Sequence, residues 1–282
     1  MSVRGQALRA MSRALGGKGL HFGVHATVDL RRWDGPTVVV VGEACAEVEA
    51  LRVVGTRRAT VVQLAHDGAS ISTVEHLFAA LGAHRLSRGV RVVVEGPELP
   101  LLDGGSMEYC RAIAGLNVPP APSLLRVARD GDVEVGASCF AFRVATETHV
   151  SVDVDFGDAR IARLASWGGD ALDFADRIAS ARTFALERDL PELARDRLAA
   201  YVPPESVVFV GEQIHAAGRP FAPDEPARHK LLDLIGDSFV YGGPAIGHVH
   251  AVRPGHAANH AAFQDALASG ILVRGPIGGA RP

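Results

Sequence analysis

Hydrophobic residues alternate with polar ones, or gather in valine-rich runs, in short segments separated by turn residues. Runs of about four to eight residues with this pattern are typical of β-strands. In the first half of the chain they predict strands at residues 25–33, 37–42, 58–64 and 89–96. Beyond a proline-rich break they predict strands at residues 123–129, 139–145, 149–156 and 205–211.

Helical periodicity is found between these predicted strands. In residues 70–86, Val74, Leu77, Phe78 and Leu81 follow the i, i+3, i+4, i+7 spacing of a helix with one buried face. The same reasoning predicts helices at residues 105–116, 173–182, 190–200 and 227–239, and a strand, a Pro-Gly break and a terminal helix within 245–270.

The proline-rich stretch "NVPPAPS" (117–123) is the predicted domain boundary. It divides the chain into an N-terminal domain, residues 1–120, and a C-terminal domain, residues 121–282. Both halves run through strands, a helix, a strand and a helix, although we find no clear sequence identity between them. This order of elements predicts an α+β fold with helices layered on sheets.

Composition and charge narrow the class of protein. Hydrophobic residues make up 48% of the 282 residues and charged ones 22%, as in folded globular proteins. Lys and Arg total 29 against 32 Asp and Glu, a net charge of −3, so we expect no nucleic-acid partner. The hydrophobic runs have the length of strands, which predicts no transmembrane segment.

Three well-separated cysteines form neither a CxxC pair nor a disulfide framework, which favours a reduced, cytoplasmic setting. The first 19 residues, "MSVRGQALRAMSRALGGKG", lack the apolar core of a secretory signal, so we expect none.

His229 and Asp233 stand four residues apart in the predicted helix "EPARHKLLDLIGD" (225–237), with Lys230 beside the histidine. This spacing puts both side chains on one helix face, roughly 5–6 Å apart at Cβ, where they can bind one metal ion. The alternative interpretation is an ordinary His–Asp pair on a solvated face.

His76 lies on an otherwise apolar predicted helix with Glu75 next to it. It is either a buried core histidine or a third ligand. If it meets His229 and Asp233, the three side chains leave a fourth metal position for water, as in catalytic zinc sites. Glu75 would then be a carboxylate placed to act as general base. No cysteine lies near these motifs, which argues against a closed structural zinc site.

His256 follows a Pro-Gly turn in "RPGHAANH" (253–260), where we expect it to be exposed and able to donate a proton. Asp237 lies two turns beyond His229 on the same predicted helix and would hold such an imidazole in its charged form. The alternative for both is an ordinary loop or surface position.

Taken together, the motifs resemble the UDP-3-O-acyl-N-acetylglucosamine deacetylase family, zinc amidases of lipid A biosynthesis. The resemblance implies two similar α+β domains, each with helices packed on a sheet, and an active site between them. The matching stretches, scattered over residues 19–260, are "GLHFG" (19–23), "STVEHLFAAL" (72–81), "GPELPLLDGG" (96–105), "ARTFAL" (181–186), "RHKLLDLIGD" (228–237) and "GHAANH" (255–260).

The resemblance also implies a role for each matched residue. It implies Glu75 as the base that activates water, His256 as the acid, and Asp237 as the residue that positions His256. Thr183 is implied to stabilise the oxyanion, and Phe184 to line the sugar site. The cations implied near the diphosphate are Lys230 and Arg253. The implied zinc ligands are His76, His229 and Asp233.

The implied cofactor is Zn²⁺, with Fe²⁺ as the alternative ion in the cell. The implied partner is a small acylated nucleotide sugar, and we expect a monomer. Phe22 in "GLHFG", and "YVPPESVVFVG" (201–211) in place of the family's Gly-Gly-Ser turn, depart from the pattern in regions that contact the acyl chain. Competing hypotheses are therefore a divergent paralogue that deacetylates another N-acetyl sugar conjugate, and a catalytically silent binding protein on the same fold.

Overall fold

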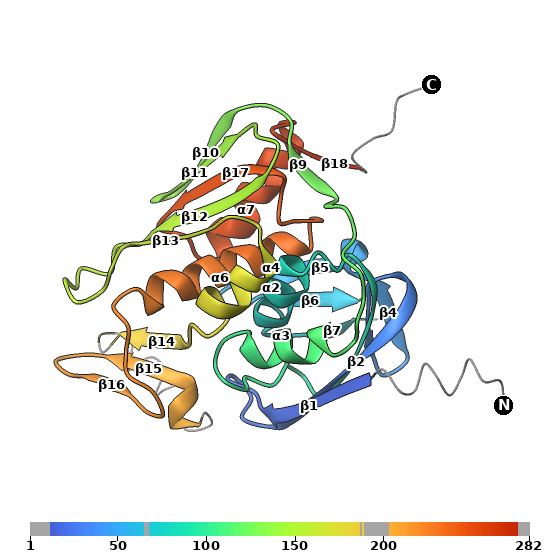
Figure 1. Cartoon of the computed structure of the whole chain (residues 1–282), viewed down its shortest axis with the longest axis horizontal. Helices are drawn as coiled ribbons and strands as arrows, with labels where there is room; N and C mark the ends of the chain where they lie inside the picture. The colour runs from blue at the N-terminus through green and yellow to red at the C-terminus, as the bar shows by residue number, and fades with distance from the viewer. Residues whose placement is uncertain (1–11, 65–67, 187, 189–202, 276–282) are drawn as a thin grey trace.

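The computed structural model describes residues 12–64, 68–186, 188 and 203–275, and it confirms the predicted α+β class. Figure 1 shows a central group of helices with the N-terminal sheet on one side and the C-terminal sheet on the other. The predicted helix at residues 190–200 lies outside the described residues. Among the described residues, no helix is both long and apolar enough to span a bilayer.

The N-terminal sheet has five strands in the order β1-β2-β8-β3-β4. Its neighbours pair antiparallel except β3 and β8, which are parallel. The burial of β8 alternates along its length, so one face of the sheet packs on the core. The strands are β1 (Ser12–Lys18), β2 (His25–Pro36), β3 (Val38–Val41), β4 (Ala44–Glu47) and β8 (Arg88–Glu95).

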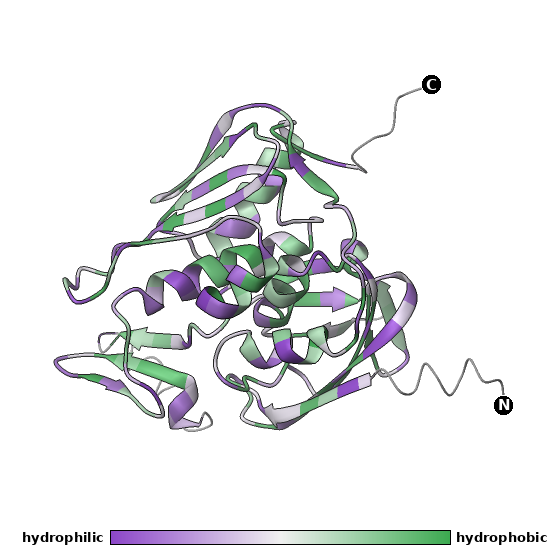
Figure 2. Cartoon of the chain, viewed as in Figure 1, coloured by the Kyte–Doolittle hydropathy of each residue, from purple (hydrophilic) through white to green (hydrophobic). Residues whose placement is uncertain are grey.

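The C-terminal sheet repeats this topology in the order β10-β11-β17-β12-β13. Again one pair, β12 with β17, is parallel and the others are antiparallel. Its strands carry alternating hydrophobic and hydrophilic bands in Figure 2. They are β10 (Gly131–Val135), β11 (Ser138–Arg143), β12 (Thr148–Asp153), β13 (Leu164–Trp167) and β17 (Gly247–Val252).

In each half, the first four strands of the five-stranded sheet precede a central helix, and the fifth strand then enters the middle of that sheet. The first of these helices, α2 (Glu75–Ala83) and α6 (Glu225–Phe239), pack against each other in the centre of the molecule. A second helix follows the central strand in each half: α3 (Met107–Ala114) and α7 (His256–Ala268). The strand order agrees with a duplicated architecture, and the boundary near residue 120 stays a prediction.

Smaller elements connect the two sheets and helices. A three-stranded sheet precedes α2 and another precedes α6, and a two-stranded sheet joins the residues after the boundary to the end of the described chain. These sheets contain β5 (Arg52–Gly55), β6 (Val61–Leu64) and β7 (Ala69–Ile71); β14 (Thr183–Leu186), β15 (Val207–Val210) and β16 (Ile214–Ala216); and β9 (Leu125–Val127) and β18 (Leu272–Arg274). Short helical turns are η1 (Val48–Ala50), α4 (Ala171–Asp173), η2 (Phe174–Ile178) and η5 (Pro204–Ser206).

The predicted helix at 173–182 is wrong in its second half. Phe174 and Ile178 are fully buried and account for the helical pattern, but the helical turns end at Ile178. Arg182, which follows, is drawn into a buried ion pair with Glu225 of α6, and the chain continues as β14. A long-range contact therefore overrides the local periodicity.

Candidate active site

The crossing of α2 and α6 brings two distant segments together. His76 is the second residue of α2, while His229 and Asp233 lie one turn apart on α6. The helices approach closely at Gly236, where an added Cβ atom would lie 2.1 Å from the backbone oxygen of Glu75. Only glycine permits such an approach between two backbones.

The three side chains are buried around one point. A ligand atom from each lies within 4.8 Å of the others, and Asp233 Oδ1 is 3.5 Å from His229 Nε2 and 3.9 Å from His76 Nε2. Each is less than 5% exposed. The alternative of a solvated His–Asp pair on α6 is therefore wrong.

The polar atoms at this point fit a divalent cation. Asp233 Oδ1 is buried and has no hydrogen-bond partner within the described part of the chain. His229 Nδ1 donates to the carbonyl of Ala181 at 3.0 Å, which leaves Nε2 as the free lone pair when the ring is neutral. Bonds of about 2 Å to one ion bring ligand atoms within roughly 4 Å of each other.

The protonation states of the three side chains also favour the binding of a divalent cation. Burial, together with the neighbouring His229, lowers the pKa of His76 to about 3. Burial also lowers the pKa of His229. For Asp233, burial acts to raise the pKa, but the charge of Lys230 and the histidines outweigh it and hold the pKa below its ordinary value. At neutral pH the chain thus presents two neutral imidazoles and one carboxylate, the forms that bind metals.

Glu75, His256 and Asp237 form a second buried group beside the first. His256 Nδ1 donates to Asp237 Oδ2 at 2.9 Å, and His256 Nε2 lies 3.9 Å from both Glu75 Oε1 and Asp233 Oδ2. His256 is the first residue of α7 and only 9% exposed, so the expectation of an exposed histidine is wrong. The packing of α7 against α6 covers it.

The environments of the two proton-carrying groups push their pKa values apart. Burial raises the pKa of Glu75 to about 7, although the charge of His256 opposes the shift. For His256, burial acts to lower the pKa, but Asp237 and the other carboxylates outweigh it and raise the pKa to about 10. Burial would raise the pKa of Asp237, yet His256 and His260 hold it well below its ordinary value.

Of the other residues predicted from sequence, three lie beside the candidate metal ligands and one, Arg253, lies at the surface. Lys230 Nζ donates to Asp233 Oδ2 at 2.8 Å and lies 5.7 Å from the centre of the Phe184 ring. Phe184 packs edge-on against His229, with ring centroids 6.1 Å apart. Thr183 begins β14, next to the segment that accepts the His229 hydrogen bond. Arg253 is exposed on the turn before His256, and no hydrogen bond joins its side chain to the buried group in the described ranges.

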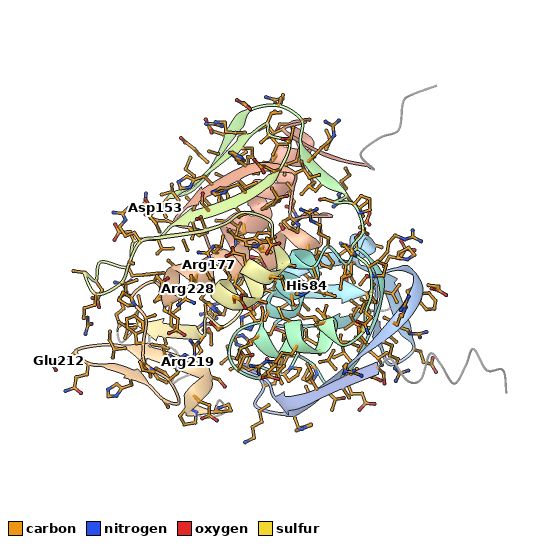
Figure 3. All side chains as sticks on the ribbon, viewed as in Figure 1. His84, Asp153, Arg177, Glu212, Arg219 and Arg228 are labelled. Atoms are coloured by element: carbon orange, nitrogen blue, oxygen red, sulfur yellow. The ribbon has the colours of Figure 1, made fainter. Side chains whose placement is uncertain are left out.

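A buried ion cluster fixes the segment before β14 to the start of α6. The Glu225 carboxylate accepts hydrogen bonds from the backbone amide, Nε and Nη2 of Arg182, at 2.8–3.1 Å. Arg219, labelled in Figure 3 and located after β16, donates to the same carboxylate at 2.8 Å. This cluster holds the Ala181 carbonyl where His229 needs it.

Four further side chains near Asp237 did not emerge from the sequence. Asn259 Nδ2 donates to Asp237 Oδ2 at 2.8 Å, and His260 Nε2 lies 3.4 Å from Asp237 Oδ1. Both follow His256 by about one helical turn, which was a usable signal. Thr60 and Tyr241 belong to no recognisable motif, so only the structure reveals them.

Two buried imidazoles and a carboxylate make a candidate metal site, and a second carboxylate and imidazole lie beside them. Catalytic metal sites of hydrolases are built from side chains of these types. The family model for UDP-3-O-acyl N-acetylglycosamine deacetylase (LpxC) matches residues 8–268. The chain belongs to this family, which confirms the resemblance seen in the sequence motifs.

Curated relatives agree over nearly the whole chain. The UDP-3-O-acyl-N-acetylglucosamine deacetylase of Myxococcus xanthus is 36% identical over 272 residues, covering 88% of this chain and 81% of the relative. The enzyme of the same name from Anaeromyxobacter dehalogenans is 36% identical over 265 residues, covering 89% and 84%. The one from Chlamydia trachomatis is 30% identical over 272 residues, covering 90% and 93%.

Proposed function

We propose that this protein hydrolyses the acetamide of UDP-3-O-acyl-N-acetylglucosamine, releasing acetate, as a step of lipid A biosynthesis. The observation that carries the proposal is the buried convergence of His76, His229 and Asp233 beside Glu75 and His256. We propose Zn²⁺ as the ion, with Fe²⁺ as the alternative in the cell. Residues 1–120 and 121–282 would be the two domains of a monomeric, cytoplasmic enzyme.

A divalent ion held by these three residues supplies Lewis acidity toward a water molecule and toward the acetamide carbonyl. Glu75 takes a proton from the attacking water, whose oxygen bonds to the carbonyl carbon. The carbon–nitrogen bond then breaks, and His256 gives its proton to the departing nitrogen, so that acetate and a free amine leave. The raised pKa of Glu75, about 7, and of His256, about 10, support these roles, because between those values the base is ionised and the acid protonated.

Other residues would bind and orient the substrate. Thr183 donates a hydrogen bond to the developing oxyanion. Lys230 and Arg253 attract the diphosphate, and Phe184 lines the sugar site next to His229. Asp237 keeps the imidazole of His256 oriented and charged.

Acetate release from purified protein tests the proposal. The acylated UDP-sugar should release one acetate per molecule, and UDP-N-acetylglucosamine without the acyl chain should react far more slowly. Glu75→Gln should keep the metal and lose turnover by about 10²–10⁴-fold, because a general base is removed. Release from the non-acylated sugar alone would support the divergent paralogue, and bound metal with no release from either would support the silent binding protein.

A further inference from the structure

Thr60 is a buried residue that links Glu75 and His256 by hydrogen bonds: it contacts Glu75 directly and His256 through Asp237. It lies directly before β6 and is 1% exposed. Its hydroxyl donates to Asp237 Oδ1 at 2.6 Å. Its backbone amide donates to Glu75 Oε2 at 3.0 Å, and its carbonyl accepts from the amide of Val74, the residue before α2.

The hydrogen bonds around this hydroxyl run in one direction. Because the Thr60 proton is given to Asp237, the hydroxyl oxygen accepts from His260 Nε2, 2.9 Å away. With a neutral His260, Nδ1 then accepts from the Tyr241 hydroxyl at 3.0 Å. Tyr241, His260 and Thr60 therefore donate in series toward Asp237 Oδ1, and the other oxygen of Asp237 accepts from His256 Nδ1.

This chain of hydrogen bonds crosses between the two halves of the molecule. Thr60 and Glu75 come from the N-terminal half, while Asp237, His256 and His260 come from α6 and α7. Low exposure makes each bond costly to lose, and hydrogen bonds in such a chain strengthen one another.

We propose that Thr60 is a positioning residue for the deacetylation: its amide and hydroxyl hold Glu75 and Asp237 at a fixed separation, and so set His256 against Glu75. The effect on catalysis rests on the proposed function, whereas the positions of Glu75 and Asp237 rest on this hydrogen-bond geometry alone. Without the hydroxyl, Asp237 Oδ1 retains only the longer 3.4 Å contact to His260, and nothing else ties this carboxylate to the N-terminal half among the residues the structure describes.

Paired variants separate the hydroxyl from the shape of the side chain. Thr60→Val removes the hydroxyl and keeps the volume, while Thr60→Ser restores the hydroxyl. Thr37→Val is the matched control, since Thr37 is also 1% exposed and its hydroxyl donates at 2.7 Å to the Leu86 carbonyl, away from the site. If Thr60→Val is not recovered folded, Thr60→Ala replaces it with the same expectations.

Each variant is measured for acetate release, metal content and unfolding. For Thr60→Val we expect kcat per bound metal to fall about 10–100-fold, the usual effect of losing an outer partner of a metal site. Its KM should change by less than about threefold, because the substrate contacts remain. Thr60→Ser should recover to within about threefold of wild type, and Thr37→Val should lose stability without losing kcat.

Proton NMR of the metal-free protein gives a readout independent of turnover. The Nδ1–H resonance of His256, which donates to Asp237, should broaden or disappear in Thr60→Val and persist in Thr60→Ser and Thr37→Val. The proposal is overturned if Thr60→Val keeps wild-type kcat, or if Thr60→Ser falls as far as Thr60→Val, or if the resonance is unchanged. Wild-type protein that releases no acetate would refute the proposed function instead, and the NMR comparison would still decide whether the hydroxyl holds this pair.

Discussion

Replacing Gly236 with alanine tests whether the close crossing of α2 and α6 holds the proposed metal ligands together. A Cβ atom at this position lies 2.1 Å from the backbone oxygen of Glu75 and 2.8 Å from its carbonyl carbon. Cβ atoms essentially never come within 3.0 Å of another heavy atom. The two helices must therefore separate by about 1 Å, since close-packed interiors leave no room for a smaller adjustment.

The expected change in stability has the opposite sign to that of the same substitution in an exposed helix. In an exposed helix, Gly→Ala raises stability by about 1 kcal/mol. Overpacking a core costs about 1–3 kcal/mol, and here the obstructing atom is backbone, which cannot rotate away. We expect a net loss of about 2 kcal/mol or more in the free energy of unfolding. Because His76 moves with α2 away from Asp233, zinc affinity should fall at least about tenfold.

Urea unfolding of the metal-free protein and zinc competition against a chelator measure the two effects. Gly82→Ala in α2 is the control, because its new Cβ atom comes no closer than 3.1 Å to another heavy atom, the ring of Pro244, so a shift of a few tenths of an ångström accommodates it. We expect that control to change stability by less than about 1 kcal/mol. A Gly236→Ala variant with wild-type stability and zinc affinity would show that the crossing tolerates the added atom and does not fix the ligand positions.

Two other predictions concern buried charges. Glu225→Gln leaves the buried guanidinium of Arg182 without its negative counter-charge and should cost about 3–5 kcal/mol in urea unfolding. Asp173→Asn, in an exposed ion pair, should cost no more than about 1 kcal/mol; equal losses would contradict this account. In metal-free protein, an NMR titration should give His256 a pKa of about 10, and Asp237→Asn should lower it. Since folding raises this pKa, the associated stability is complete below pH 6.5 and lost as the pH rises through about 10. A wild-type value near 6.5 would remove Asp237 as the cause.

The sequence predicted the central strands of both five-stranded sheets and none of the edge strands. Central strands such as β8 and β12 bury alternate residues between two paired neighbours, so their patterns are strong. Within these two sheets the missed strands are the four edges, β1, β4, β10 and β13. Edge strands pair on one side only, and here they contain residues such as the glycines of β1 and the exposed Leu164 of β13, which weaken the alternation.

In the candidate site, too, the residues identified from sequence are those with a local pattern, and the residues missed depend on long-range packing. Local spacing was enough to single out His229 with Asp233, and His76 with Glu75, because each pair lies within one helix. The burial of His256 was not predictable, since it depends on how α7 packs against α6. Thr60 was invisible, because a threonine before a short strand carries no local sign of contacts 177 and 200 residues away.

The proposed function requires three side chains from α2 and α6 to bind one zinc ion. Anomalous diffraction at the zinc absorption edge, from crystals of protein reconstituted with one equivalent of Zn²⁺, tests it most directly. We predict a single peak, about 2.0–2.2 Å from His76 Nε2, His229 Nε2 and Asp233 Oδ1. A peak elsewhere in the chain, or His76 turned away from the other two ligands, would contradict the account.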